Sequence, residues 1–188
     1  MERLSAGFLI AMPQLGDPNF HRAVVLVLEH SAEGAVGLVL NRPAPELTLE
    51  ELAKSQSLRV AGALGREPVY LGGPVETHRG FLLHDRSGVA EKHSIVPGVF
   101  LSETKDSLAE LLGEGAGNVR FFLGYAGWGP LQLEQELAQG TWLFTEATSE
   151  RVLKTDPGSL WDEVLRQMGV DPAMLQSSAV QHKDPRTN

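Results

Sequence analysis

Runs of β-branched residues and leucine alternate with short polar or glycine-containing turns through the first hundred residues. Apolar runs of about four to eight residues are typical of strands that are covered on both faces. The pattern predicts strands over residues 7–12, 23–30, 35–41, 69–73, 80–85 and 98–102. The turn "SAEG" predicts that the second and third strands form a hairpin, and we expect segments 69–73 and 80–85 to pair with each other.

Two prolines and a capping pattern follow the third strand. Pro43 and Pro45 are expected to stop its ladder, because proline has no N–H to donate. Thr48 and Glu51 match a capping box, so a helix should begin directly after Thr48. A second helix is predicted over residues 103–112, closed by Gly113.

Strands and helices alternate in the second half of the chain. The segment "NVRFFLGYAGW" predicts a central strand, and Pro130 suits the first position of a helix that reaches residue 138. Residues 141–146 predict the last strand. The clearest amphipathic stripe indicates a helix that packs on the sheet, and it consists of Leu160, Trp161, Val164, Leu165 and Met168.

Early hairpins and later alternation together predict an α+β fold, a single compact domain in which helices pack against a mixed, largely antiparallel sheet. We expect residues 1–178 to form this domain and residues 179–188 to be a disordered tail. The apolar stretch 6–12 is too short for a secretion signal and is interpreted as a strand, so a cytoplasmic protein is expected.

Composition narrows the possible chemistry. The 188 residues include no cysteine, which excludes disulfides, thiolate catalysis and cysteine-ligated metals. The formal net charge of −8 and the lack of a basic stripe argue against direct nucleic-acid binding. No apolar run approaches the ~18 residues that span a bilayer, so no membrane partner is expected.

The stretch "GYAGWG" (124–129) raises the question of a phosphate cradle. Its glycines run G-x-x-G-x-G, the reverse of the dinucleotide fingerprint, and no Lys-Ser/Thr pair follows them. We therefore interpret it first as a strand-to-helix turn. It could still form a pocket wall, because Gly127 permits close backbone approach and the rings of Tyr125 and Trp128 suit a groove. Core filling is the alternative for both rings.

Other turns carry polar groups at strand ends. Asp17–Pro18 favours a turn, Asn41 and Arg42 end the third strand, and "GGPV" begins at Gly72. We hypothesise that these bends meet the glycine-rich turn at one edge of the sheet. The candidate pocket comprises Asp17, Pro18, Asn41, Arg42, Gly72, Gly73, Pro74, Tyr125, Gly127 and Trp128.

Metal and nucleophile signals are missing from the sequence. The six histidines form no H-E-x-x-H and no i, i+4 pair, so we predict neither a metal nor a cofactor, and we interpret His30 and His84 as exposed turn residues. There is also no G-x-S-x-G elbow and no S-x-x-K motif. An enzyme of unrecognised type, perhaps a hydrolase, stays open as an alternative, with Asp17, His21 and His84 as acid–base groups.

Three segments together resemble the bacterial AlgH/YqgE family: "GFLIAMPQLGDPNFHRAVVLVLEHSAEGAVGLVLNRP", "VYLGGPVETHRGFLLH" and "FFLGYAGWGPLQLEQELAQGTWL". The resemblance implies a compact α+β fold and a cytosolic bacterial protein, but no established catalytic residue. AlgH-like proteins often carry a transcriptional-regulator label, which implies an effect on gene expression more than a DNA-binding motif. We therefore expect a non-enzymatic regulatory or binding protein that acts through a small ligand or a protein partner.

Overall fold

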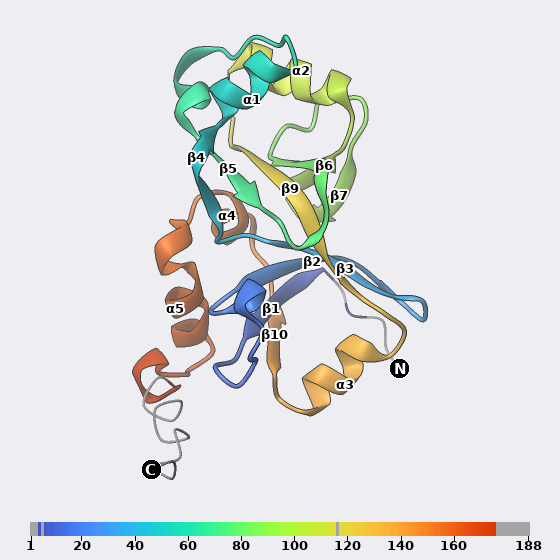
Figure 1. Cartoon of the computed structure of the whole chain (residues 1–188), viewed down its shortest axis with the longest axis vertical. Coiled ribbons are helices and arrows are strands. Elements are labelled where there is room, and N and C mark those ends of the chain that lie inside the picture. Colours follow the sequence, from blue (N-terminus) through green and yellow to red (C-terminus); the bar gives the residue numbers. More distant parts are fainter. Residues whose placement is uncertain (1–3, 5, 116, 176–188) are drawn as a thin grey trace, which may run out of the picture.

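One long strand, β9 (Val119–Trp128), runs through the middle of the molecule and belongs to two halves of a curled sheet (Figure 1). The computed structural model describes residues 4, 6–115 and 117–175. The main path of the sheet is β10-β1-β2-β3-β9-β6-β8-β7, and β4 and β5 attach beside it. The remaining strands are β1 (Gly7–Ala11), β2 (Val24–Ser31), β3 (Gly34–Val39), β4 (Pro43–Thr48), β5 (Pro68–Leu71), β6 (Val75–His84), β7 (His93–Val96), β8 (Val99–Ser102) and β10 (Trp142–Glu146).

Helices cover the ends and one side of this sheet. Helices α1 and α2 lie together at one end, α3 lies at the opposite end, and α5 flanks the half that contains β1 (Figure 1). The α-helices are α1 (Leu49–Ser55), α2 (Lys105–Glu114), α3 (Gln132–Ala138), α4 (Ser149–Leu153) and α5 (Pro157–Gln167), and the 3-10 turns are η1 (Pro18–Phe20) and η2 (Gly62–Arg66).

Among the described strand pairs, β5 and β9 run parallel and the others are antiparallel. This mixed, largely antiparallel sheet with helices packed on it confirms the predicted α+β class. The predicted hairpin is also present, with Leu26 opposite Leu38 in the β2–β3 ladder. The Thr48–Glu51 capping box forms as expected, because each side chain accepts from the other residue's backbone N–H.

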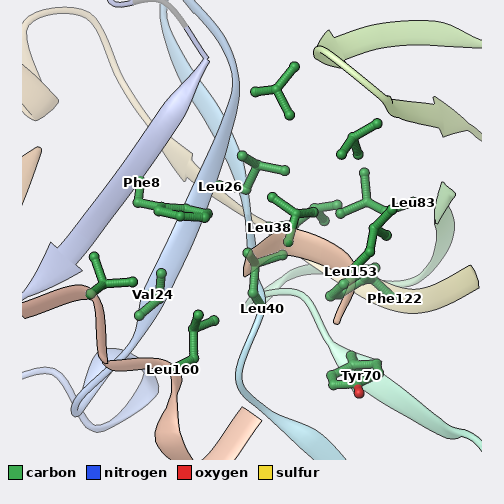
Figure 2. Close-up of a cluster of buried hydrophobic side chains, with 14 of the residues drawn as sticks. Phe8, Val24, Leu26, Leu38, Leu40, Tyr70, Leu83, Phe122, Leu153 and Leu160 are labelled. Carbon is green, nitrogen blue, oxygen red and sulfur yellow. The ribbon is translucent and has the colours of Figure 1, made fainter. Parts of the chain in front are cut away.

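The buried side chains form three clusters, and the largest joins both halves of the sheet to α5. Phe8, Leu26, Leu38 and Phe122 face one another in this cluster (Figure 2). The predicted stripe on α5 packs here through Trp161 and its neighbours, and the Trp161 indole donates to the Ala11 carbonyl at 2.9 Å. The second cluster surrounds Trp128 and Trp142, and the third lies under α1 and α2.

Strand pairing differs from the prediction in two places. Segments β5 and β6 do not pair with each other, because β9 lies between them and pairs with both. Pro43 does not stop the ladder. It begins β4, where Pro43 lies opposite Tyr70 at the edge of the sheet, a position where the missing N–H costs little.

Helix boundaries also differ. Helix α2 continues through Gly113 and ends at Glu114, and its C-cap is Gly115, whose φ of 61° is the left-handed conformation that glycine tolerates. Helix α3 begins at Gln132 and not at Pro130, after Leu131 in a left-handed conformation. Strand β7 and helix α4 were not predicted, and the expected tail, residues 179–188, lies outside the described residues.

Candidate functional site

The stretch 124–129 was predicted as a turn, but its residues as far as Trp128 belong to β9, and only Gly129 lies in the turn that leads to α3. A network of hydrogen bonds around Glu136 holds this junction. One oxygen of its carboxylate, Oε2, accepts from the indole N–H of Trp128 at 2.9 Å and of Trp142 at 2.8 Å. The other oxygen, Oε1, accepts from the Gln132 side-chain amide at 2.9 Å, and Gln132 in turn accepts from the Gly129 backbone N–H. Each of these donors has its acceptor within the chain, which favours the turn interpretation over an anion cradle.

The three candidate residues near the end of β9 do not share one site. Trp128 is buried in the second cluster, where its ring lies 6.3 Å from Phe20 and 5.8 Å from Trp142. Tyr125 instead packs edge-on against Phe81 and lines a different cavity of about 560 Å³. Gly127 is exposed and faces the Tyr125 ring.

Four of the other candidates do meet around one hollow, which we call the Arg42 groove. It has a volume of about 410 Å³, and its lining includes Pro18, Arg42, Leu71, Gly73, Pro74 and Thr77. Residues from η1, the end of β3, the β5–β6 connection and β9 thus come together from four separate parts of the sequence. Pro18, Arg42, Gly73 and Pro74 are therefore the predicted candidates that lie around one hollow.

Asp17 and Asn41 do not line the groove, but they hold the loops beside it. The Asp17 carboxylate accepts from the backbone N–H of Asn19 at 2.8 Å and thereby caps η1. The Asn41 side chain accepts from the Val24 N–H and donates to the Arg22 carbonyl, both at 2.9 Å. These bonds fix the loop next to Arg42, which donates to the His21 carbonyl.

Gly73 lines the groove, whereas the predicted candidate Gly72 precedes it in the chain and is not part of the lining. Both glycines are closely packed against β9. Gly73 has a φ of 154°, and a Cβ there would lie 2.1 Å from the Tyr125 carbonyl carbon. A Cβ on Gly72 would lie 2.3 Å from the Gly124 oxygen. Both positions need glycine because two backbone segments pass too closely for a side chain.

The lining suits a ligand that is part apolar and part anionic. Leu71 is 48% exposed, whereas most large apolar side chains among the described residues are buried. Leu123 and Val39 add further apolar lining to the groove. Arg42 supplies a permanent positive charge. Leu71 and Thr77 were not predicted from the sequence as site residues. The position of Leu71 directly before Gly72 and Gly73 could have indicated that it lies at the Arg42 groove.

The histidines correct the sequence interpretation. His84 is fully buried, and its Nε2 lies 3.0 Å from Ser102 Oγ while Nδ1 accepts from the Arg86 N–H. Burial lowers the pKa of His84, against an opposing effect of Asp85. His30 is buried as well, with Nε2 at 2.9 Å from Glu134 Oε1. Neither is an exposed turn residue.

The acid–base set of the enzyme alternative does not gather at the groove. His84 is enclosed between β6 and β8, whereas Asp17 caps η1 and His21 directs its carbonyl to Arg42. Within the described residues, no group of three His, Asp or Glu side chains is arranged to hold a metal ion. The helices in the same part of the chain are also too short or too polar to cross a bilayer.

Known proteins resemble this chain over nearly its whole length. The AlgH-like family model matches residues 8–173. A UPF0301 protein of Myxococcus xanthus is 61% identical over 175 residues, which are 93% of this chain and 96% of the relative. The chain belongs to the AlgH-like family.

Two solved structures agree with this fold. The solution structure of the AlgH protein from Pseudomonas aeruginosa superposes with a TM-score of 0.74 at 32% identity and covers 94% of this chain and 97% of its own. A crystal structure from Corynebacterium diphtheriae, 22% identical, has a TM-score of 0.71 over 95% and 94% of the two chains and supports the fold alone. None of these names assigns a reaction to an AlgH-like chain.

Proposed function

We propose that this AlgH-like chain is a non-enzymatic regulatory protein of the cytoplasm that acts by binding a small ligand or a segment of a protein partner in the Arg42 groove. The occupant combines an apolar body, which contacts Leu71 and Leu123, with a negatively charged group, which pairs with Arg42. An effect on gene expression would then follow from binding and would not need direct contact with DNA.

The state of Arg42 is the observation that carries this proposal. Its guanidinium is half-buried and donates to one backbone carbonyl, and within residues 6–115 and 117–175 it forms no ion pair. A bidentate pair with a carboxylate or phosphate would use the N–H groups that the His21 carbonyl leaves free. Because η1 and Asn41 already fix the loop, binding would cost little conformational entropy.

The test is a binding screen with matched variants. Ligand-observed NMR against panels of acidic metabolites and of short acidic, apolar peptides should give saturable binders, whose dissociation constants are then measured by calorimetry. Arg42→Gln should weaken binding at least tenfold, since it removes a charge-assisted hydrogen bond worth about 1.5–3 kcal/mol. Leu71→Gln should weaken the same binders.

Leu131 provides the control, because it is similarly exposed but lies at the start of α3 and outside the groove. Leu131→Gln should leave affinity unchanged. Absence of any saturable binder, or equal weakening by Leu71→Gln and Leu131→Gln, would contradict the proposal. Turnover of a panel compound that depends on Asp17 would favour the hydrolase alternative.

A further inference from the structure

A second arginine, Arg120, lies inside the central strand. Side chains two residues apart in a strand share a face, so Arg120 and Phe122 both point toward the first cluster. Both contact the same ring: Tyr70 lies 5.2 Å from the Phe122 ring and 5.4 Å from the Arg120 guanidinium. Figure 2 shows Tyr70 and Phe122 in this cluster, with Tyr70 at one end of the group of side chains that is drawn.

Arg120 is only 8% exposed and its hydrogen bonds are incomplete. Nη2 donates to the Thr155 carbonyl at 2.6 Å, but Nη1 is buried and has no partner among the described residues. No carboxylate lies within ion-pair distance of it in that part of the chain. A buried guanidinium without a counter-ion is costly, and burial correspondingly lowers the pKa of Arg120.

Arg120 also lines a cavity of about 420 Å³, which lies between the start of β9, η2 and the end of α4. This volume falls within the range of small-molecule sites. The charged residues of its wall are Arg120, Lys154 and Glu67. The lining itself therefore carries one net positive charge, before the nearby Asp156 is counted, and Arg120 and Lys154 are the two groups in it that can bind an anion.

Neutral groups complete the wall. Gly115 and Gly117 both have positive φ and leave backbone accessible without side chains, and Asn118 stands next to them. The Asn118 amide is held by Asp85, with its backbone and side-chain nitrogens 3.0 and 2.6 Å from the carboxylate oxygens. Asp156 is the further acid that acts on Arg120 through space, and its carboxylate already caps α5.

We infer that this cavity is a second ligand site, distinct from the Arg42 groove, in which Arg120 and Lys154 receive the phosphate or carboxylate group of a small organic anion. The ligand supplies the counter-charge that Arg120 lacks among the described residues. Glu67 opposes binding by repulsion and so limits affinity. The site is independent of the proposed function, because none of the residues used here lines the Arg42 groove.

Titrations of the full chain with three probes test the inference: inorganic phosphate, a nucleoside monophosphate and succinate. Each is followed by ¹H–¹⁵N NMR up to roughly 10 mM, which nearly saturates a site with a 1 mM dissociation constant. We expect saturable shifts at Gly115, Gly117 and Asn118 and at the Arg120 Nε–H. Binding of the phosphates alone identifies a phosphate ligand, and binding of succinate alone identifies a carboxylate ligand.

Two exposed charges allow a test that does not disturb the core. Lys154→Gln should weaken binding about threefold, and Glu67→Gln should tighten it by a similar factor, since each changes one screened charge at the wall. A purely structural Arg120 would not produce this opposite pair of effects. Lys105→Gln, an exposed lysine on α2 away from the cavity, is the matched control and should change nothing.

Arg120→Lys completes the set, because it keeps the charge but loses the planar fork of donors and should weaken binding at least tenfold. The inference is overturned if no probe gives a saturable shift, or if Lys154→Gln and Glu67→Gln shift affinity no more than Lys105→Gln does. It is also overturned if the saturable shifts lie at the Arg42 groove, whose occupancy would then support the proposed function alone.

Discussion

Glu136 and Arg120 are two charged side chains set among aromatic rings, and they differ in how completely their hydrogen bonds are used. Glu136 accepts from two indoles and one amide, so both of its oxygens are engaged inside the chain. Arg120 makes one bond to a carbonyl and leaves Nη1 without a partner among the described residues. Because buried polar groups are normally satisfied, the fold alone accounts for the bonds of Glu136, whereas the incomplete bonds of Arg120 are consistent with the ligand inferred above.

Removing the Glu136 carboxylate should produce the largest effect on stability. Glu136→Ala leaves two buried indole N–H groups without an acceptor and should lower the free energy of unfolding by about 2–4 kcal/mol. Urea unfolding followed by circular dichroism measures the change. Glu110→Ala, at an exposed position on α2, is the control and should stay within about 0.5 kcal/mol of the parent. A loss that small for Glu136→Ala would show that the turn does not depend on this network.

Replacing Arg120 should have a much smaller effect on stability, although it is more buried than Glu136. Arg120→Met removes an unpaired buried charge but also leaves the Thr155 carbonyl without its donor. These changes oppose each other, so we expect the free energy of unfolding to stay within about 1 kcal/mol of the parent. The same urea measurement applies. A loss above about 3 kcal/mol would mean that Arg120 is retained for folding, and the contrast with Glu136 would disappear.

The contrast also shows what could be predicted from the sequence. The apolar runs predicted most strands and the α+β class, because a strand's pattern is local. The placement of β9 between β5 and β6 was missed, since nothing in either segment indicates a partner strand that lies 35 to 52 residues further along the chain. Pro43 was misjudged for a related reason: whether proline ends a ladder depends on whether its strand lies at an edge, and the edge is set by the whole sheet.

Polar partners were harder still to predict. Arg42 and Gly73 were found because turns concentrate polar residues and glycine, but Arg120 lies within a strand-like run and gives no local sign of a cavity. Its hydrogen-bond partner is 35 residues away. His84 was taken for a surface residue because it follows an apolar run. Its polar partner is Ser102, which lies on β8 and comes close to His84 only because β8 pairs with β6.

We expect the smallest effect on stability at His84. Like Glu136 and unlike Arg120, it has a partner for each of its polar atoms, because both ring nitrogens are engaged. Burial lowers its folded-state pKa below the ordinary value of 6.5, so the unfolded chain takes up the proton first as the pH falls. The stability that neutral His84 contributes is therefore fully present above about pH 6.5 and is lost as the pH falls toward the folded-state pKa. Urea unfolding at about pH 7.5 and at about pH 5 should show that the free energy of unfolding falls with the pH and that His84→Gln reduces this fall. An NMR titration of the wild-type imidazoles gives a direct measure: a His84 ring that titrates at or above about pH 6.5 would mean that burial and two engaged ring nitrogens do not protect this group from protonation.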